Sequence, residues 1–245
     1  MIDFIKVFLL FCFCGLGYSW QDVRNADQSL WAFRTCQRRS SNVDLVKKWM
    51  AYVLPDDKET HCYVMCAWSL LGAYSEEAKA FNINGITKQF KERGMNVPKE
   101  VQIFGGRTDG CKAVYDKTVK VFKTQLQNFR NAFYGTKESS DEWFKANPNT
   151  KPKGTKISTF CEAKGIGDCI HSCSFYYYRL IDEDNLIIPF SYLPGYPETK
   201  LKECRRQVQD LAGCKSDALF LCLKNADKAA LEASLKQLDD QSKVY

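Results

Sequence analysis

The chain has few of the residues and motifs on which most enzymes and metal sites depend. Only two of its 245 residues are histidines, His61 and His171. The motifs G-x-S-x-G and H-E-x-x-H and the phosphate-binding P-loop are absent from the sequence. No two cysteines have the C-x2-C spacing that is typical of zinc sites. We therefore expect a protein that is not an enzyme and that needs no cofactor or metal.

Long apolar segments are also scarce. An unbroken apolar run at residues 7–14 is too short to span a bilayer, which takes about 20 residues. The small residues Gly17 and Ser19 follow it, which is the form of a secretory signal peptide cleaved after Ser19. A disordered or buried N-terminal segment is the alternative. We expect a secreted protein with no stable membrane association.

Cysteine, by contrast, is abundant. Cys12 and Cys14 lie in the predicted signal peptide, and the other 10 of the 12 cysteines remain in the mature chain. An even number of cysteines in a secreted protein predicts a disulfide framework, here of five bridges. A C-x3-C pair occurs twice, at residues 62–66 and 169–173. Two such cysteines face the same side of a helix, so each can join that helix to a different neighbour.

The positive charge of the chain is concentrated in its middle. Residues 112–157 hold ten lysines and arginines against four acids, which accounts for the whole net charge of +6. Such a segment could attract nucleic acid, a membrane surface or a small anion, or it could simply be a solvated helix face. We expect no nucleic-acid partner, because the protein is predicted to be secreted and the basic patch lacks interleaved exposed aromatics of the stacking kind.

The hydrophobic periodicity is helical almost throughout. Apolar residues recur at helical spacing over 28–39, 57–74, 111–134, 167–182, 200–212, 215–225 and 227–239. Gly135 is expected to end the 111–134 helix as its C′ residue. Residues 145–156, rich in lysine and proline, indicate a connection between domains. We expect an all-α protein with a signal peptide (1–19), an N-terminal domain (20–144), a basic linker (145–156) and a shortened C-terminal domain (157–245).

The cysteine spacing and several short segments resemble a known family. The pattern Cys36-x25-Cys62-x3-Cys66-x44-Cys111 is similar to that of the insect odorant-binding fold. The segments LWAFRTC (30–36), CYVMC (62–66), FYG (133–135) and TFCE (159–162) resemble the D-seven family, the two-domain salivary proteins of blood-feeding flies, and the sand-fly type most of all. The resemblance implies a monomer from the salivary gland with two tandem disulfide-stapled odorant-binding-protein-like helical domains. It also implies the pairs Cys36–Cys66, Cys62–Cys111, Cys161–Cys173, Cys169–Cys214 and Cys204–Cys222.

The resemblance further implies what the protein binds. Members of the family sequester host eicosanoids, cysteinyl leukotrienes or thromboxane, in the first domain, which opposes inflammation, vasoconstriction and platelet aggregation. Such a lipid acid needs an apolar channel for its tail and a cation for its carboxylate. For the channel the resemblance implies Trp49, Tyr63, Phe33 and Tyr134. From the pattern alone, Trp49 and Phe33 could equally be core residues, and Tyr63 could be buried with a local partner.

For the carboxylate the family uses a basic residue upstream of the TFCE segment. Lys151 is our first choice, with Lys153, Lys145 and Lys156 as alternatives, and each could be merely solvated. Two other functions stay open. A biogenic-amine site in the second domain is disfavoured, because the 23 residues after Cys222 hold no aromatic residue before Tyr245. The basic surface could also inhibit haemostasis by binding an anionic protein or membrane.

Overall fold

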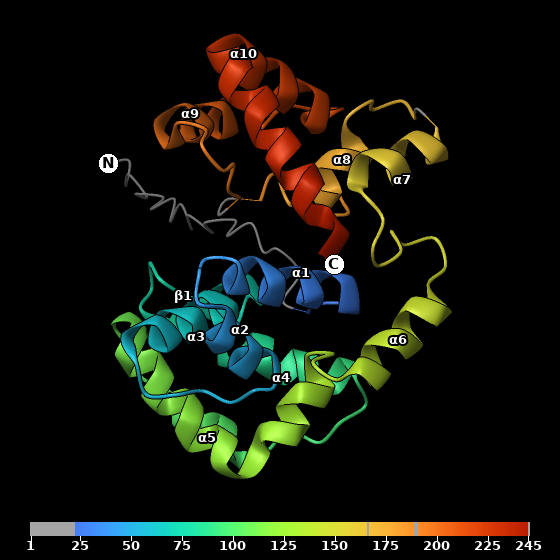
Figure 1. The fold of residues 1–245 in the computed structure, drawn as a ribbon. Helices are drawn as coiled ribbons and strands as arrows, with labels where there is room; N and C mark the ends of the chain where they lie inside the picture. Colours follow the sequence, from blue (N-terminus) through green and yellow to red (C-terminus); the bar gives the residue numbers. More distant parts are fainter. Residues whose placement is uncertain (1–22, 166, 189–190, 245) are drawn as a thin grey trace, which may run out of the picture.

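The computed structural model describes residues 23–165, 167–188 and 191–244, and the expected signal peptide (1–19) lies outside these ranges. The chain forms two helical bodies, drawn one above the other in Figure 1. The N-terminal body contains α1 (Ala26–Gln37), α2 (Val43–Met50), α3 (Lys58–Leu70), α4 (Ile83–Glu92), η1 (Lys99–Phe104), α5 (Gly110–Ala132) and α6 (Lys137–Ala146). The C-terminal body contains α7 (Ile157–Lys164), α8 (Ser172–Tyr177), α9 (Glu198–Val208), α10 (Lys215–Gln241) and η2 (Ser242–Val244). The strands described are β1 (Tyr74–Ser75) and β2 (Ala80–Phe81), an antiparallel pair in which Tyr74 faces Phe81.

Polar side chains fix where the N-terminal helices begin. Asn25 accepts a hydrogen bond from the Gln28 amide (2.9 Å), and the Gln28 side chain accepts one from the Asn25 amide (3.0 Å). This reciprocal capping box satisfies two backbone donors that a helix start otherwise leaves free. Asn42 and Asp57 cap α2 and α3 through their own side chains. Side chains thus cap α1, α2, α3, α4 and α6, whereas α5 and the helices of the C-terminal body begin without a side-chain cap from the N-cap residue.

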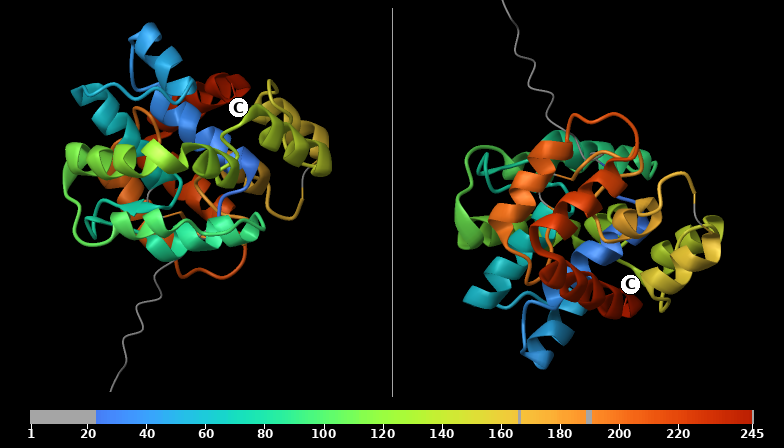
Figure 2. Two further views of the ribbon diagram at one scale, coloured as in Figure 1. Left: turned by 90° about the horizontal axis from the view of Figure 1, so that it is seen from below. Right: turned by 90° about the horizontal axis from the view of Figure 1, so that it is seen from above.

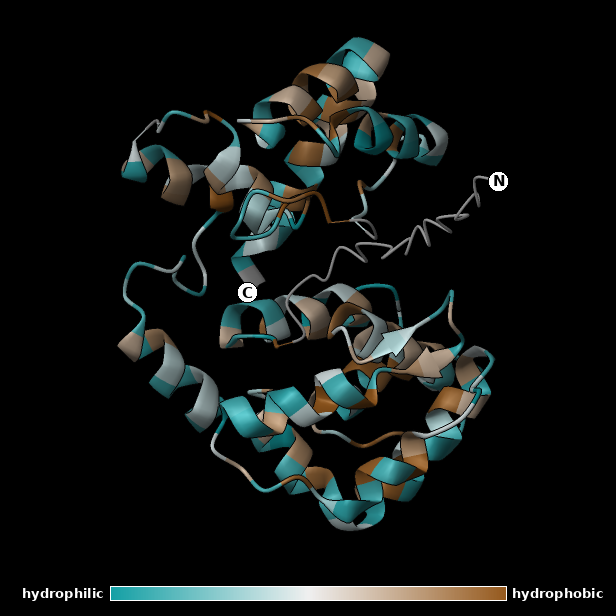
Figure 3. Cartoon of the chain, turned by 180° about the vertical axis from the view of Figure 1, so that it is seen from behind, coloured by the Kyte–Doolittle hydropathy of each residue, from teal (hydrophilic) through white to brown (hydrophobic). Residues whose placement is uncertain are grey.

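An aromatic cluster forms the core of the N-terminal body, where α3 packs along α5. Trp68 of α3 lies at its centre, and its indole Nε1 donates a hydrogen bond to Thr118 of α5 (2.8 Å). Five phenylalanine rings have centroids 5.5–6.1 Å from that of Trp68: Phe81, Phe104, Phe122, Phe129 and Phe133. Hydrophobic and hydrophilic residues are interspersed along the helices (Figure 3).

The C-terminal body has a separate core. Its fully buried residues include Ile157, Leu180, Leu201, Leu219 and Leu223. The helix α10 is interrupted at Asp227, whose φ/ψ of −164°/88° is not helical. The Asp227 carboxylate accepts a hydrogen bond from the amide of Ala230 (3.1 Å), so it caps the second half of α10. The expected helices over 215–225 and 227–239 thus form one kinked element.

The five disulfides have the pairing that the resemblance implies. Within the N-terminal body, α3 is joined to α1 by Cys66–Cys36 and to α5 by Cys62–Cys111. The C-terminal pairs are Cys161–Cys173, Cys169–Cys214 and Cys204–Cys222. Each C-x3-C pair therefore joins its segment to two different neighbours. Cys62 and Cys66 do so from one face of α3, as the helical spacing predicts, whereas Cys169 precedes α8 and is not in a helix.

Several predicted helix boundaries are wrong. The helix expected over 167–182 is only Ser172–Tyr177, because the backbone of Arg179 turns into the left-handed region (φ 59°). The helix expected over 57–74 ends at Leu70, because Gly72 takes a positive φ and the next residues form β1. The helix α6 is not anticipated from the sequence, and it reaches the first two residues of the segment expected as a linker.

Buried polar contacts join the two bodies. Asp27 of α1 forms a buried ion pair with Arg179, which follows α8. The end of α10 reaches α1 (Figures 1 and 2), where Arg38 donates a hydrogen bond to the carbonyl of Gln241 (3.2 Å). None of the helices in the described ranges is long and apolar enough to cross a membrane.

Candidate ligand-binding site

An apolar cavity lies inside the N-terminal body, between α1, α2, α3 and α5. Its volume is about 40 Å³, so a larger ligand enters only if the wall side chains move apart. Its walls are almost entirely aromatic and aliphatic: Phe33, Trp49, Tyr52, Leu54, Tyr63, Val64, Ala67, Trp68, Leu71, Thr118, Phe122, Phe129 and Phe133. We call this space the inner cavity. Walls of this kind are suited to the hydrocarbon part of a small ligand.

Two stacked rings form one wall of the inner cavity. Trp49 of α2 is 2% exposed, and its indole Nε1 donates a hydrogen bond to Thr60 (2.9 Å). Tyr63 of α3 is 8% exposed and stacks on the Trp49 ring. Burial raises the pKa of Tyr63 to about 12, although a hydrogen bond with Gln37 and the charge of Arg34 oppose the shift. The Tyr63 hydroxyl is therefore neutral at physiological pH.

A wider and more polar space adjoins the inner cavity. Its volume is about 410 Å³, and it shares four residues with the cavity: Phe33, Trp49, Tyr52 and Tyr63. Its remaining walls come from α1, α2, the end of α5, α6 and the chain beyond it: Leu30, Arg34, Gln37, Met50, Arg130, Tyr134, Gly135, Thr136, Lys137, Ser140 and Lys153. We call this space the outer basin. The inner cavity is thus apolar, and the neighbouring basin has cations in its wall.

The turn from α5 into α6 shapes the floor of the basin. The amides of Gly135 and Tyr134 donate hydrogen bonds to the carbonyls of Arg130 (2.6 Å) and Asn131 (3.4 Å), which is a Schellman motif. The left-handed C′ residue is Tyr134 (φ 54°), so the expectation that Gly135 occupies this position is wrong. Position 135 needs glycine for another reason, because a Cβ there would overlap the Tyr52 hydroxyl.

Four cationic side chains line the outer basin, and they differ in whether an acidic residue pairs with them. Lys137 and Lys153 both bind the carboxylate of Asp141, at 2.7 and 2.8 Å. Arg34 donates a hydrogen bond only to a neutral partner among the contacts described, the side chain of Gln37 (2.9 Å). The Arg130 guanidinium lies 4.9 Å from the centre of the Tyr52 ring. The two arginines are thus the cations that lie free of acidic partners in the described part of the basin.

The structure brings most of the predicted binding residues to one site. Phe33, Trp49 and Tyr63 line both spaces, and Tyr134 and Lys153 line the basin. Lys145 is exposed on α6 and lines neither space, and Lys156 instead pairs with Asp240 near the C-terminus.

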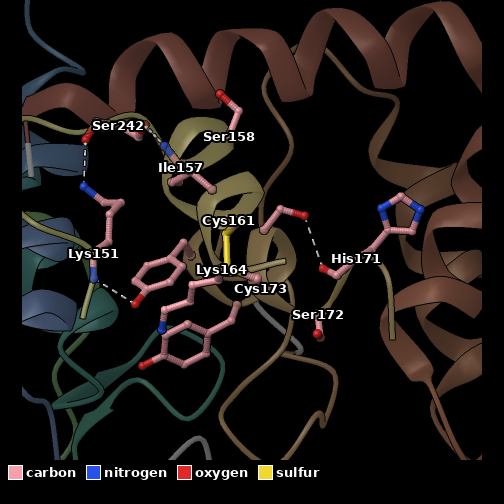
Figure 4. The surroundings of a disulfide bond; sticks show 12 residues. Lys151, Ile157, Ser158, Cys161, Lys164, His171, Ser172, Cys173 and Ser242 are labelled. Carbon is pink, nitrogen blue, oxygen red and sulfur yellow. Dashed lines mark hydrogen bonds between the residues drawn. A yellow bond between two sulfur atoms is a disulfide. The ribbon is translucent and has the colours of Figure 1, made fainter. Parts of the chain in front are cut away.

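Lys151 must be reassigned. Its side chain is 0% exposed, and the ammonium donates hydrogen bonds to the carbonyls of Pro152 (3.4 Å), Thr155 (3.1 Å) and Ser242 (3.2 Å). Figure 4 shows the Lys151 ammonium directed toward Ser242, away from the Cys161–Cys173 disulfide. Our first choice for the carboxylate therefore lines neither the inner cavity nor the outer basin. Its ammonium instead joins the connection between the bodies to Ser242, near the C-terminus.

Sequence reasoning missed Tyr52, Arg34, Arg130 and Ser140 as wall residues. Arg34 shares a helical face with Phe33 and Gln37, so the pattern of α1 was a usable signal. Arg130 and Ser140 meet only through the α5–α6 turn, which local sequence does not reveal.

Neither a metal site nor a catalytic pair lies at this site. Within the described ranges, no three metal-ligating side chains gather in one place. His61 Nε2 lies 2.6 Å from a carboxylate oxygen of Asp56, and His171 stacks on Phe220, but none of these residues lines the inner cavity or the outer basin.

The comparisons with known proteins define first a class and then a family. The profile of the PBP/GOBP family matches residues 24–127, which include the inner cavity except for the last turn of α5. This is a family of odorant-binding-like, ligand-binding folds and not one of enzymes.

The long form salivary protein D7LC of Phlebotomus papatasi is 50% identical over 97% of this chain and 97% of its own length. The native D7 protein from Phlebotomus duboscqi has a solved structure that is 44% identical with a TM-score of 0.82, covering 93% of this chain and all of that one. The chain therefore belongs to the long-form D7 salivary proteins, and it is a secreted salivary protein.

Two more distant structures share the fold with bound ligands. The AeD7–leukotriene E4 complex is 18% identical with a TM-score of 0.73 and covers 91% of each chain. The AnSt-D7L1–U46619 complex is 21% identical with a TM-score of 0.66 and covers 92% of this chain and 90% of that one.

Proposed function

We propose that the N-terminal body binds one host eicosanoid, with its tail in the inner cavity and its carboxylate in the outer basin, and releases it unchanged. The observation that carries this proposal is an aromatic cavity that shares four wall residues with a basin lined by two arginines without acidic partners among the described residues. The related complexes with leukotriene E4 and with the thromboxane analogue U46619 support the same ligand class.

The tail supplies most of the binding energy. Burial of a methylene contributes about 0.8 kcal/mol, so about twelve methylenes contribute on the order of 10 kcal/mol before the cost of association. Affinity in the nanomolar range is then feasible without any chemical step. A scavenger of this kind lowers the free concentration of a mediator, which opposes inflammation, vasoconstriction and platelet aggregation.

Polar groups near the tail provide selectivity. The Tyr63 hydroxyl is neutral, lies on the wall of the inner cavity and has an amide partner in Gln37. It can donate a hydrogen bond to a hydroxyl on the ligand chain or accept one from it. Such a hydrogen bond contributes about 1 kcal/mol net. Hydroxylated eicosanoids should therefore bind more tightly than arachidonate.

Isothermal titration calorimetry of the full mature chain tests this proposal. The panel is leukotriene E4, leukotriene C4, U46619, arachidonate and serotonin. We expect at least one eicosanoid to bind in a 1:1 ratio with submicromolar affinity and serotonin not to bind at that level. If no lipid binds below about 10 µM, equivalent to only about −7 kcal/mol, the proposal fails and the basic-surface inhibitor becomes the better explanation. Submicromolar serotonin affinity would instead favour the amine-binding alternative.

A further inference from the structure

The walls of the inner cavity must part before a lipid tail can enter it. The cavity has a volume of about 40 Å³, which is enough for only a few water molecules. Pockets that hold ligands of drug size have volumes of about 300–1,000 Å³. At least one wall of the cavity therefore has to move when the ligand binds.

Disulfides fix three of the four helices that surround the cavity. Cys36–Cys66 joins α1 to α3, and Cys62–Cys111 joins α3 to α5. The sequence of α2 contains no cysteine, and α2 packs less extensively on its neighbours than α3 packs on α1 and α5. The helix α2 is therefore the wall that can move while every disulfide stays intact.

The outer face of α2 is open to solvent. The apolar side chains of Val43 and Met50, seven residues apart on that face, are exposed. The connections that flank α2, residues 38–42 and 51–57, form neither helix nor strand. In the second connection Tyr52 has a φ of 58°, a left-handed conformation that costs free energy for a residue with a side chain. A movement of α2 away from the cavity is thus directed into solvent and allows the Tyr52 backbone to relax.

Trp49 holds α2 against the rest of the body. Its ring stacks on Tyr63, and its indole Nε1 donates a hydrogen bond to the buried Thr60. Both partners belong to α3, so these contacts join the movable helix to the cross-linked helices. Trp49 lines the inner cavity, the outer basin and a third space of about 720 Å³, whose walls also include Leu45 and Lys48 of α2. Displacement of this one side chain therefore opens the inner cavity to the two larger spaces.

We infer that α2 is a lid over the inner cavity, and that the contacts of Trp49 with Tyr63 and Thr60 are the latch that keeps the lid closed in the ligand-free protein. This inference rests on the proposed function and adds how the ligand reaches its site. The lid stays displaced while a tail occupies the cavity, because the closed cavity has no room for the tail. The latch therefore opposes binding, since the apparent affinity is reduced by the fraction of the protein that is open.

A second tryptophan–threonine hydrogen bond in the same body provides a matched control. Trp68 Nε1 donates to Thr118 over 2.8 Å, as Trp49 Nε1 donates to Thr60 over 2.9 Å, and both threonines are buried. Each threonine hydroxyl also donates a hydrogen bond to a carboxylate or carbonyl oxygen. The Trp68–Thr118 bond, however, joins α3 to α5, which a disulfide already holds together. Its loss should destabilise the body without releasing the lid.

The test measures the binding of leukotriene E4 to the full mature chain by stopped-flow tryptophan fluorescence. Thr60→Val removes the acceptor of the latch and keeps the shape of the side chain. We expect this variant to bind the ligand about fivefold faster and about fivefold more tightly than the wild type, the effect of one hydrogen bond on the open fraction. Thr118→Val should lose a similar amount of thermal stability and should bind no faster than the wild type.

Hydrogen exchange of the ligand-free protein, followed by mass spectrometry, tests the lid without a ligand. The amides of α2 should exchange at least about tenfold faster than those of α3, because α2 opens without the rest of the body. Thr60→Val should accelerate exchange in α2 and leave the interior of α3 unchanged. Exchange of α2 as slow as that of α3 overturns the lid.

The kinetic outcomes separate the lid from the proposed function. An unchanged or slower association in a folded Thr60→Val protein overturns the lid and leaves the proposed function intact. An equal acceleration in Thr60→Val and Thr118→Val also overturns it, because any loosening of the body would then admit the ligand. Absence of leukotriene E4 binding by the wild type counts against the proposed function, and the exchange rates then decide by themselves whether α2 opens.

Discussion

Trp49 and Tyr63 stack face to face, with ring centroids 4.2 Å apart and planes within 1° of parallel. The pair is a common wall of the inner cavity and the outer basin. One ring comes from α2 and the other from α3, which the disulfide at Cys66 joins to α1. Disulfides thus hold α3 in place, and the ring stack packs α2 against α3. In the proposed binding mode this wall lies between the ligand tail and its head group.

The Tyr63→Phe substitution should separate tail recognition from head-group recognition. It removes one hydroxyl and keeps the ring that stacks on Trp49. We expect hydroxylated eicosanoids to bind about fivefold more weakly, equivalent to about 1 kcal/mol, while arachidonate affinity stays the same. Calorimetry with both ligands measures the difference. An equal change in affinity for both ligands would mean that the Tyr63 hydroxyl acts only within the protein structure and does not contact the ligand hydroxyl.

The Gly135→Ala substitution should damage the basin through a steric contact. The added Cβ would overlap the Tyr52 hydroxyl, so Tyr52 must move. We expect a loss of about 1–3 kcal/mol in the free energy of unfolding, as for other overpacked sites, together with weaker lipid binding. Gly167→Ala is the matched control, because a Cβ there has open space around it and should change stability by less than about 0.5 kcal/mol. Urea denaturation monitored by tryptophan fluorescence gives both values, and equal stabilities of the two variants would contradict this account of position 135.

Alkaline pH should destabilise the protein through Tyr63. Burial raises its pKa from the ordinary value of 10.0 to about 12, so the unfolded chain loses this proton first as the pH rises. The contribution is fully present below about pH 10 and is lost as the pH rises from about 10 to about 12. We expect the free energy of unfolding to fall across that window in the wild-type protein and to fall less in Tyr63→Phe. Parallel pH profiles for the two proteins would show that Tyr63 titrates normally.

Lys151→Ala should affect stability and not affinity. The substitution removes a buried ammonium and leaves three backbone carbonyls without their donor. We expect a loss of about 2 kcal/mol in the free energy of unfolding, with carboxylate affinity unchanged within twofold. Lys145→Ala, at an exposed position of α6, should change neither quantity. A tenfold loss of affinity in a folded Lys151→Ala protein would return the head-group role to this lysine.

The sequence predicts the helices and the disulfide framework well, because helical periodicity is a local signal and disulfides are covalent links. The apolar period over 111–134 gives α5 (Gly110–Ala132) within two residues, and the i, i+4 cysteines explain how α3 is joined to two neighbours. The helix around Cys173 is shorter than predicted, because backbone turns at Gly165 and Arg179 depend on packing that no period reveals. The expected domain limits at 144 and 157 stay a prediction.

The candidate site is likewise predicted only in part from the sequence. Aromatic wall residues such as Trp49 and Phe33 are found through the resemblance to the family, because the pattern alone also allows them to be core residues. The cations proposed for the ligand carboxylate are not found in this way. A lysine in the connection between the bodies can point toward the cavity or bind its own chain, and Lys151 donates a hydrogen bond to the Ser242 carbonyl. Arg34 and Arg130 come together only through tertiary structure.

A cavity-filling variant tests the central claim most directly. Ala67 lies on α3 in the wall of the inner cavity, so Ala67→Phe places a ring where the account puts the ligand tail. The measurement is calorimetric titration of leukotriene E4 into the wild-type protein and into Ala67→Phe, after both are shown to unfold cooperatively. The account predicts one ligand per wild-type chain and a loss of at least a hundredfold in affinity for the variant. Unchanged affinity and stoichiometry in a folded Ala67→Phe protein would contradict it, because the tail would then lie outside the inner cavity.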